Sequence, residues 1–227
     1  MLKALTLSTH AASRRALALH RQVIMPVAAL LLLTVLVLGV LMVVNAATED
    51  DKARHASLET MQASIDVRVH QLDNVVADYA LWNEAVQEVQ LNHNREWADR
   101  RLGHYLHESH GYDWAFVLDP GNGTFMAADH GEPLEQDIST ALGHEDWRGL
   151  VELGRTASTA EPTARHAFLR LPEGYGLASA MAILPEESWD GPQPEGAPYV
   201  LLVIRSLDPA WLQEVADALQ LRELRFV

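Results

Sequence analysis

An uncharged and almost wholly apolar run occupies residues 23–44 and divides the chain into a short N-terminal piece and a much longer C-terminal one. A helix of that length rises about 33 Å, which is enough to cross the roughly 30 Å hydrocarbon core of a bilayer. Thr34 is the one polar side chain in the run, so such a helix has no polar face to turn toward water. The pattern predicts a transmembrane helix over residues 23–45.

The distribution of basic residues sets the expected orientation of this span. Four bases and no acid precede it, whereas Lys52 and Arg54 are the nearest bases after it; the four are Lys3, Arg14, Arg15 and Arg21. The positive-inside rule then places residues 1–22 in the cytoplasm and the rest of the chain on the other side. A cleaved signal peptide is the alternative, because Val44-Asn45-Ala46 resembles a cleavage site. The apolar run is longer than the usual 7–15 residues of a signal peptide, which favours a retained anchor.

Composition excludes several function classes. The chain has no cysteine, so it has no disulfide, no thiolate nucleophile and no Cys-ligated metal. Its net charge is −14, although the first 22 residues carry only bases. Such an acidic exported region repels nucleic acid, so no nucleic-acid partner is expected. The residues after the span suit one domain with its own core.

A long helix is predicted over residues 46–92, because neither Gly nor Pro occurs between Ala46 and Asn94. Apolar side chains recur there with alternating spacings of four and three, at Ile65, Val69, Leu72, Val76 and Tyr79. This spacing is a heptad seam that needs a partner. A second copy of the chain, the sheet that follows, or both in turn can supply it, and we expect a homodimer through this helix.

The remaining chain reads as an α+β domain with an antiparallel sheet. A second helix is expected over 95–110, ending at Gly111, and residues 114–119 and 124–128 form a hairpin around the turn 120–123. A helical stretch, broken near Gly143, covers 134–154. Three further strands are expected at 165–171, 176–184 and 199–207, with a proline-rich loop at 185–198. Asp208-Pro209 opens a last helix that reaches about residue 221.

No catalytic constellation is evident, so we expect neither an enzyme nor a cofactor. Ser179 lies in mid-strand without the second glycine of a nucleophile elbow, and His144-Glu145 lacks the second histidine of a metalloprotease helix. His104, His107 and His110 recur at spacing three on one predicted helix, but the third ring turns away from the other two. We therefore expect no metal site there.

The segment Asp78-Tyr-Ala-Leu-Trp82-Asn-Glu84 offers a candidate binding pair. On a helix, Asp78 and Trp82 are four residues apart and share one face. One interpretation is that Trp82 packs the helix on the sheet and Asp78 bonds a neighbour. The other is that the pair lines a ligand cavity.

Three stretches of the chain resemble the fourth CHASE family of extracellular sensor domains from bacterial signalling proteins. They are the segment 78–84, the segment Ala115-Phe-Val-Leu-Asp-Pro-Gly-Asn-Gly123, and the strands Ala178–Pro185 and Tyr199–Asp208. The likeness covers about residues 50–221. Ile183-Leu-Pro185 and Ile204 depart from the family pattern.

The resemblance implies a PAS-like, Cache-like sheet behind a long N-terminal helix, with residues 46–221 as the periplasmic sensor domain of a protein in the bacterial cell membrane. In the family this domain lies between two spans and controls cyclic-di-GMP turnover or a histidine kinase. Residues 222–227 would lead toward an absent second span, which makes the chain either a fragment or a stand-alone sensor.

The expected partners are the lipid bilayer, a second copy of the chain and a small polar ligand held between the sheet and the long helix. The expected ligand-binding residues are Asp78, Tyr79, Trp82, Arg170 and Arg205. A ligand amine, a water or one of the two arginines pairs with the Asp78 carboxylate. A membrane-tethered hydrolase and a non-sensing coiled-coil module are the alternatives.

Overall fold

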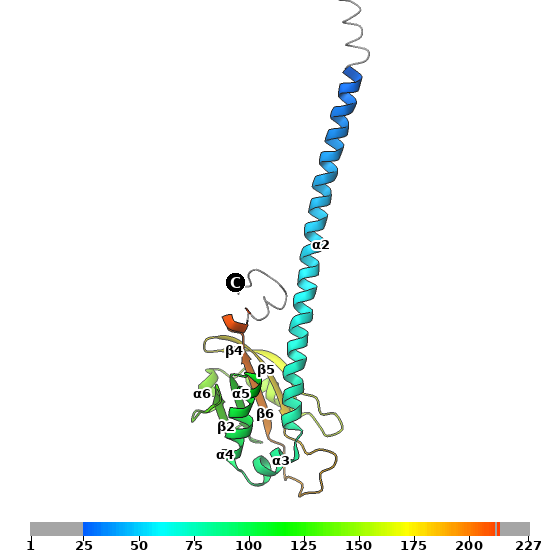
Figure 1. The fold of residues 1–227 in the computed structure, drawn as a ribbon. Helices are drawn as coiled ribbons and strands as arrows, with labels where there is room; N and C mark the ends of the chain where they lie inside the picture. The colour runs from blue at the N-terminus through cyan, green and yellow to red at the C-terminus, as the bar shows by residue number, and fades with distance from the viewer. Residues whose placement is uncertain (1–24, 212, 214–227) are drawn as a thin grey trace, which may run out of the picture. The chain divides into compact units, whose positions relative to one another are not determined.

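The computed structural model describes residues 25–211 and 213 (Figure 1), without the side chains of residues 26, 28, 29 and 43–60. The chain divides into two units, residues 1–59 and 60–227. One continuous helix, α2 (Met25–Ala80), begins in the first unit and ends in the second. The large apolar side chains described between Leu30 and Met42 are all exposed, from 47% at Val37 to 78% at Met42.

Within the described residues, no helix has the length and apolar character needed to cross a membrane. The predicted span over 23–45 lies partly outside these residues.

The second unit contains a six-stranded, fully antiparallel sheet with the strand order β3-β2-β1-β6-β5-β4. The long-range pairing of β1 with β6, Trp114 opposite Ile204, joins the N-terminal hairpin to the C-terminal three strands. The strands are β1 (Trp114–Leu118), β2 (Thr124–Asp129), β3 (Glu132–Pro133), β4 (Arg165–Leu171), β5 (Gly174–Ala182) and β6 (Val200–Ser206).

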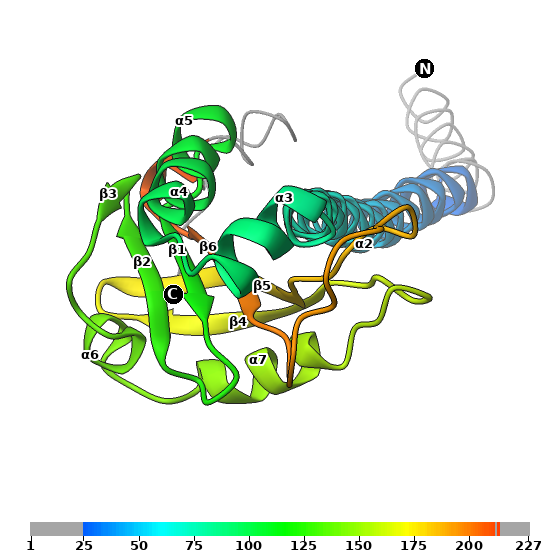
Figure 2. The ribbon, with the colours of Figure 1, turned by 90° about the horizontal axis from the view of Figure 1, so that it is seen from below.

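Helices cover both faces of this sheet, as Figure 2 shows. Successive side chains of a strand point to opposite faces, so Val117 and Val203 pack under α2, whereas Phe116 and Leu202 pack against the other layer. The helices beside the C-terminal half of α2 are α3 (Asn83–Ala85), the π-helix η2 (Val86–Leu91), α4 (Arg95–Ala98), the π-helix η3 (Asp99–His104) and α5 (Tyr105–His110). The opposite layer consists of α6 (Ile138–Leu142) and α7 (Trp147–Arg155).

Residues of the same chain cover the heptad seam over the last turns of α2. Val69, Leu72 and Val76 are at most 6% exposed and belong to the core that α2 forms with the sheet. The sheet is therefore the partner of the seam at these positions.

The long helix ends earlier than the sequence predicts, at Ala80 rather than at residue 92. Trp82 has an extended backbone (φ −144°, ψ 121°), and Leu81 forms a parallel bridge with Leu184. The Ala80 carbonyl accepts a hydrogen bond from the Leu184 backbone N–H, and the Asn83 side chain bonds both the backbone and the carboxylate of Glu186. These tertiary bonds replace the helical ladder, so the correction is a break followed by a short helix and a π-helix.

The other predicted elements occur close to their expected bounds. Gly111 has φ 68° and ends α5, and Gly143 has φ 75° and separates α6 from α7. The Asp208 carboxylate accepts from the Trp211 backbone N–H at 2.7 Å, which is the expected N-cap of the last helix. The predicted continuation of this helix to 221, and the segment 222–227, lie outside the described residues.

Candidate functional site

A groove of about 380 Å³ lies between the C-terminal end of α2 and the segment formed by η3 and α5. We call it the aromatic groove, and its walls are Val75, Asp78, Tyr79, Trp82, Arg101, Tyr105 and His110. Three of the five predicted ligand residues, Asp78, Tyr79 and Trp82, line it together. The opposite wall differs from the prediction, because it is a helical segment and not the sheet.

Tyr79 forms the centre of the groove wall. Its ring lies 6.1 Å from Trp82, 6.0 Å from Tyr105 and 5.9 Å from His110, measured between ring centroids. Burial, and then the neighbouring hydroxyl of Tyr105, raise the pKa of Tyr79 to about 12. Tyr79 therefore remains a neutral phenol at every physiological pH.

The neighbouring hydroxyls of Ser109 and Tyr79 lower the pKa of Tyr105. Tyr105 lines the groove, where its hydroxyl can donate a hydrogen bond.

Trp82 is positioned by its extended backbone and by contact with Trp97, whose ring centroid is 5.2 Å away. The Trp97 indole N–H donates to the Glu84 carboxylate at 3.1 Å, and the Asn94 side chain caps α4 by accepting from the Trp97 backbone N–H. A second recess, of about 320 Å³, adjoins the groove and is lined by Glu84, Trp97, Arg100 and Arg101. Arg101 is common to both hollows.

The two arginines that the sequence suggested as partners of Asp78 do not line the groove. Arg170 lies exposed on the edge strand β4. Arg205 donates to the carbonyl of Gly111, which ends α5. A cation at that carbonyl stabilises the C-terminal end of the helix, so Arg205 supports one wall of the groove from behind.

The histidine series does not converge. The His107 ring bonds the Tyr112 carbonyl, His104 lies 3.6 Å from Glu108, and His110 stacks on Tyr112. Among the described residues, no group of three His, Cys, Asp or Glu side chains is arranged to hold a metal ion.

Asp73 connects α2 with two strands. Its Oδ1 accepts from the buried Ser179 hydroxyl at 2.6 Å, and its Oδ2 lies 2.7 Å from Nδ1 of His166. A hydrolase triad needs the histidine between the serine and the acid. Here the aspartate lies between the other two, which is a structural clasp and not a nucleophile with its base.

Two other hollows differ in chemistry from the aromatic groove. The first, of about 790 Å³, lies at the sheet end where β1 and β5 begin and β6 ends, and its walls include Asp113, Trp114, Asp129, Tyr175 and Asp208. We call it the sheet-end pocket.

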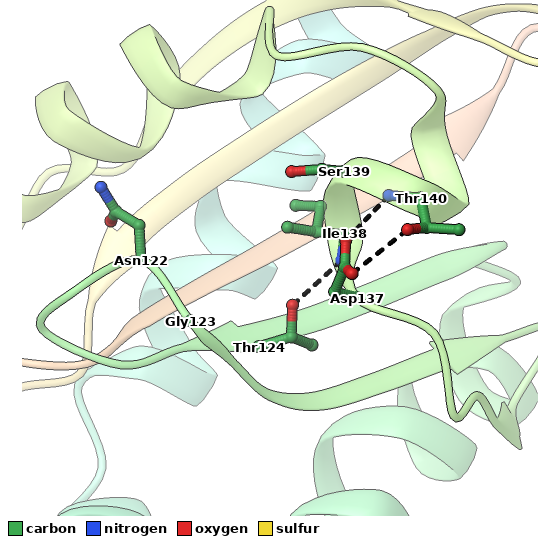
Figure 3. A pocket seen from close by; sticks show the side chains of 7 residues that line it. All are labelled: Asn122, Gly123, Thr124, Asp137, Ile138, Ser139 and Thr140. Carbon is green, nitrogen blue, oxygen red and sulfur yellow. Dashed lines mark hydrogen bonds between the residues drawn. The ribbon is translucent and has the colours of Figure 1, made fainter.

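The second lies between the β1–β2 turn and α6, as Figure 3 shows. Its polar groups largely satisfy one another: the Thr124 hydroxyl accepts from the Ile138 N–H at 3.0 Å, and the Asp137 carboxylate caps α6 at Thr140.

Sequence reasoning missed Arg101, Tyr105 and His110. The predicted helix 95–110 contains all three, and their spacing of four and five residues was the available signal. The missing information was the pairing of this helix with α2, which depends on tertiary packing.

Comparisons with known proteins bear on the domain as a whole. The CHASE4 domain family matches residues 64–227. The fold is similar to the sensory domain of the Campylobacter jejuni chemoreceptor Tlp3, solved with isoleucine bound, with 12% sequence identity and a TM-score of 0.42. That match covers 72% of this chain and 59% of the chemoreceptor chain. Comparison with curated proteins gives no match.

Proposed function

Because the chain belongs to the CHASE4 domain family of sensor domains from bacterial signalling proteins, we propose that it senses a small extracytoplasmic molecule bound in the aromatic groove. The observation that carries this proposal is the meeting of Asp78, Tyr79 and Trp82 with Arg101 and Tyr105 around one hollow. Aromatic walls with a few convergent polar groups are typical of small-molecule sites.

The position of the groove suits a sensor. One wall is α2 and its end, and the other is the η3–α5 segment, which begins at Asp99, 19 residues after α2 ends at Ala80. A ligand that contacts both walls stabilises the conformation in which the distance between the walls matches the size of the ligand. Binding therefore shifts the population of conformations that α2 adopts. Toward its N-terminus, helix α2 includes residues of the apolar run.

We also propose that residues 23–45 anchor the chain in the bacterial cell membrane, with the N-terminus in the cytoplasm and the sensor outside. The length of the apolar run and the four bases before it support this topology. The exposed apolar side chains between Leu30 and Met42 also support it, because lipid covers such a surface at lower cost than water.

Dimerisation through the long helix belongs to the same proposal. The output controlled by the sensor, cyclic-di-GMP turnover or a histidine kinase, stays a prediction from the family resemblance.

The experiment uses the full chain in lipid nanodiscs and a panel of amino acids, amines, carboxylates and betaines. We expect at least one compound to raise the melting temperature, since a ligand that binds the native state stabilises it. Asp78→Ala and Trp82→Ala should stay folded and lose this response, whereas Asp66→Ala, an exposed site on the same helix, should keep it. If Asp78→Ala melts far lower without ligand and responds like the wild type, Asp78 only fastens the fold.

A further inference from the structure

The ligand class follows from the donors, acceptors and rings that the aromatic groove presents. Building on the proposed function, we infer that the groove binds a small zwitterion with an alkylated ammonium group at one end and a carboxylate at the other. Asp78 and the faces of Tyr79 and Trp82 receive the ammonium, and Arg101 with Tyr105 receives the carboxylate.

The two walls of the groove carry opposite charge. Among the described lining residues, Asp78 is the one carboxylate and Arg101 the one guanidinium, and they come from different walls. Both act on the same phenol, since the Asp78 charge raises the pKa of Tyr79 and the Arg101 charge lowers it. A ligand that contacts both walls therefore meets a negative group on one and a positive group on the other.

The hydrogen-bond acceptors that the groove offers decide between a ligand with an alkylated ammonium and one with a primary ammonium. A primary ammonium has three N–H donors to satisfy. The described lining offers one carboxylate, that of Asp78, to such a group. A fully alkylated ammonium needs no acceptor, and aromatic ring faces attract it by the cation–π interaction. The rings of Tyr79, Trp82 and Tyr105 suit this second cation better.

The carboxylate end has donors of the right kind. Arg101 presents a planar guanidinium that matches a carboxylate, and Arg100 lines the adjoining recess. The Tyr105 hydroxyl also lines the groove and can donate to the carboxylate. The volume of about 380 Å³ is near the lower end of the usual range of about 300–1,000 Å³ for ligand pockets, which favours a small molecule.

Isothermal titration of the full chain in nanodiscs, with four probes, tests this class. Glycine betaine carries both charges, choline lacks the carboxylate, 3,3-dimethylbutyrate replaces the ammonium nitrogen by neutral carbon, and glycine has a primary ammonium. We expect glycine betaine to bind at least tenfold tighter than each of the other three. Asp78→Asn and Trp82→Ala should weaken it at least tenfold, and Asp66→Asn should not.

Arg101→Gln provides the second readout. It should bring the affinities for glycine betaine and choline to within about threefold of each other, because it removes the group that recognises the carboxylate. Glycine or 3,3-dimethylbutyrate binding as tightly as glycine betaine overturns the ligand class.

The failure of this inference can be told apart from failure of the proposed function. If glycine betaine does not bind but another panel compound does, and Trp82→Ala abolishes that binding, the ligand class is wrong and the groove remains the sensing site. If Trp82→Ala and Asp78→Asn leave the binding of every panel ligand unchanged, both the class and the site are wrong.

Discussion

At the scale of single residues, Asp73 contributes to the fold through both of its carboxylate oxygens. The Ser179 hydroxyl, which donates a hydrogen bond to Asp73, is fully buried in the sheet. Asp73→Ala leaves this hydroxyl without its partner, so we expect a loss of about 1–3 kcal/mol in unfolding free energy. Chemical denaturation of the variant measures this loss.

A double-mutant cycle identifies the cause. Asp73→Ala combined with Ser179→Ala should lose clearly less than the sum of the two single losses, since the two changes remove one shared bond. Strict additivity would show that Asp73 and Ser179 act separately.

Asp99, unlike Asp73, is a carboxyl group that the fold accommodates poorly. Within the described part of the chain its Oδ1 is buried without a hydrogen-bond partner, and burial raises the pKa of Asp99. The folded state then binds the proton more tightly than the unfolded state, so ionised Asp99 lowers stability above the folded-state pKa, and this cost disappears as pH falls below the unfolded value.

We therefore expect Asp99→Asn to melt at a higher temperature than the wild type at pH 7, with the difference shrinking below about pH 4. Melting curves across this pH range measure the effect. A lower melting temperature at pH 7 would mean that the carboxylate makes a favourable interaction in the folded state.

At the scale of elements, Gly103 fixes how closely η3 approaches the sheet. A Cβ at this position would lie 2.9 Å from the Cβ of Ala128 on β2. Gly103→Ala therefore overpacks the contact, and we expect a loss of about 1–3 kcal/mol. Gly149 on α7 has open space around it and serves as the control: Gly149→Ala should raise stability by up to about 1 kcal/mol. Equal effects of the two changes would contradict this account of Gly103.

The same elements show what sequence can and cannot predict. Short apolar runs bounded by turn residues placed β1, β2, β4, β5 and β6 within about two residues, because burial on both faces of the sheet leaves such runs in the sequence. The break after Ala80 left no local pattern, since it depends on bonds to Leu184 and Glu186 that are far away in the chain.

The candidate site also has one part that the sequence predicted and one part that it did not. Asp78, Tyr79 and Trp82 lie in one short segment that the sequence singled out. Arg101 and Tyr105 join them only through the packing of η3 and α5 beside α2, so no local signal assigned them to the site.

At the scale of the whole molecule, the proposed dimer has to use the part of α2 that the sheet does not cover. Leu72 is 2% exposed within its own subunit, whereas Met61 lies four residues before Ile65 on the same seam and is partly exposed. We expect a cysteine at position 61 to crosslink between copies in membranes and a cysteine at position 72 not to do so. Crosslinking at 72 instead would mean that the sheet releases this part of α2.

The central claim is that a small ligand binds in the aromatic groove, and hydrogen–deuterium exchange locates that ligand most directly. The full chain in nanodiscs is compared with and without the panel compound that gives the largest thermal stabilisation. We predict slower exchange in residues 75–82 and 99–110, with residues 171–175 and 206–209 at the sheet-end pocket unchanged. Slower exchange confined to the sheet-end pocket would contradict the account.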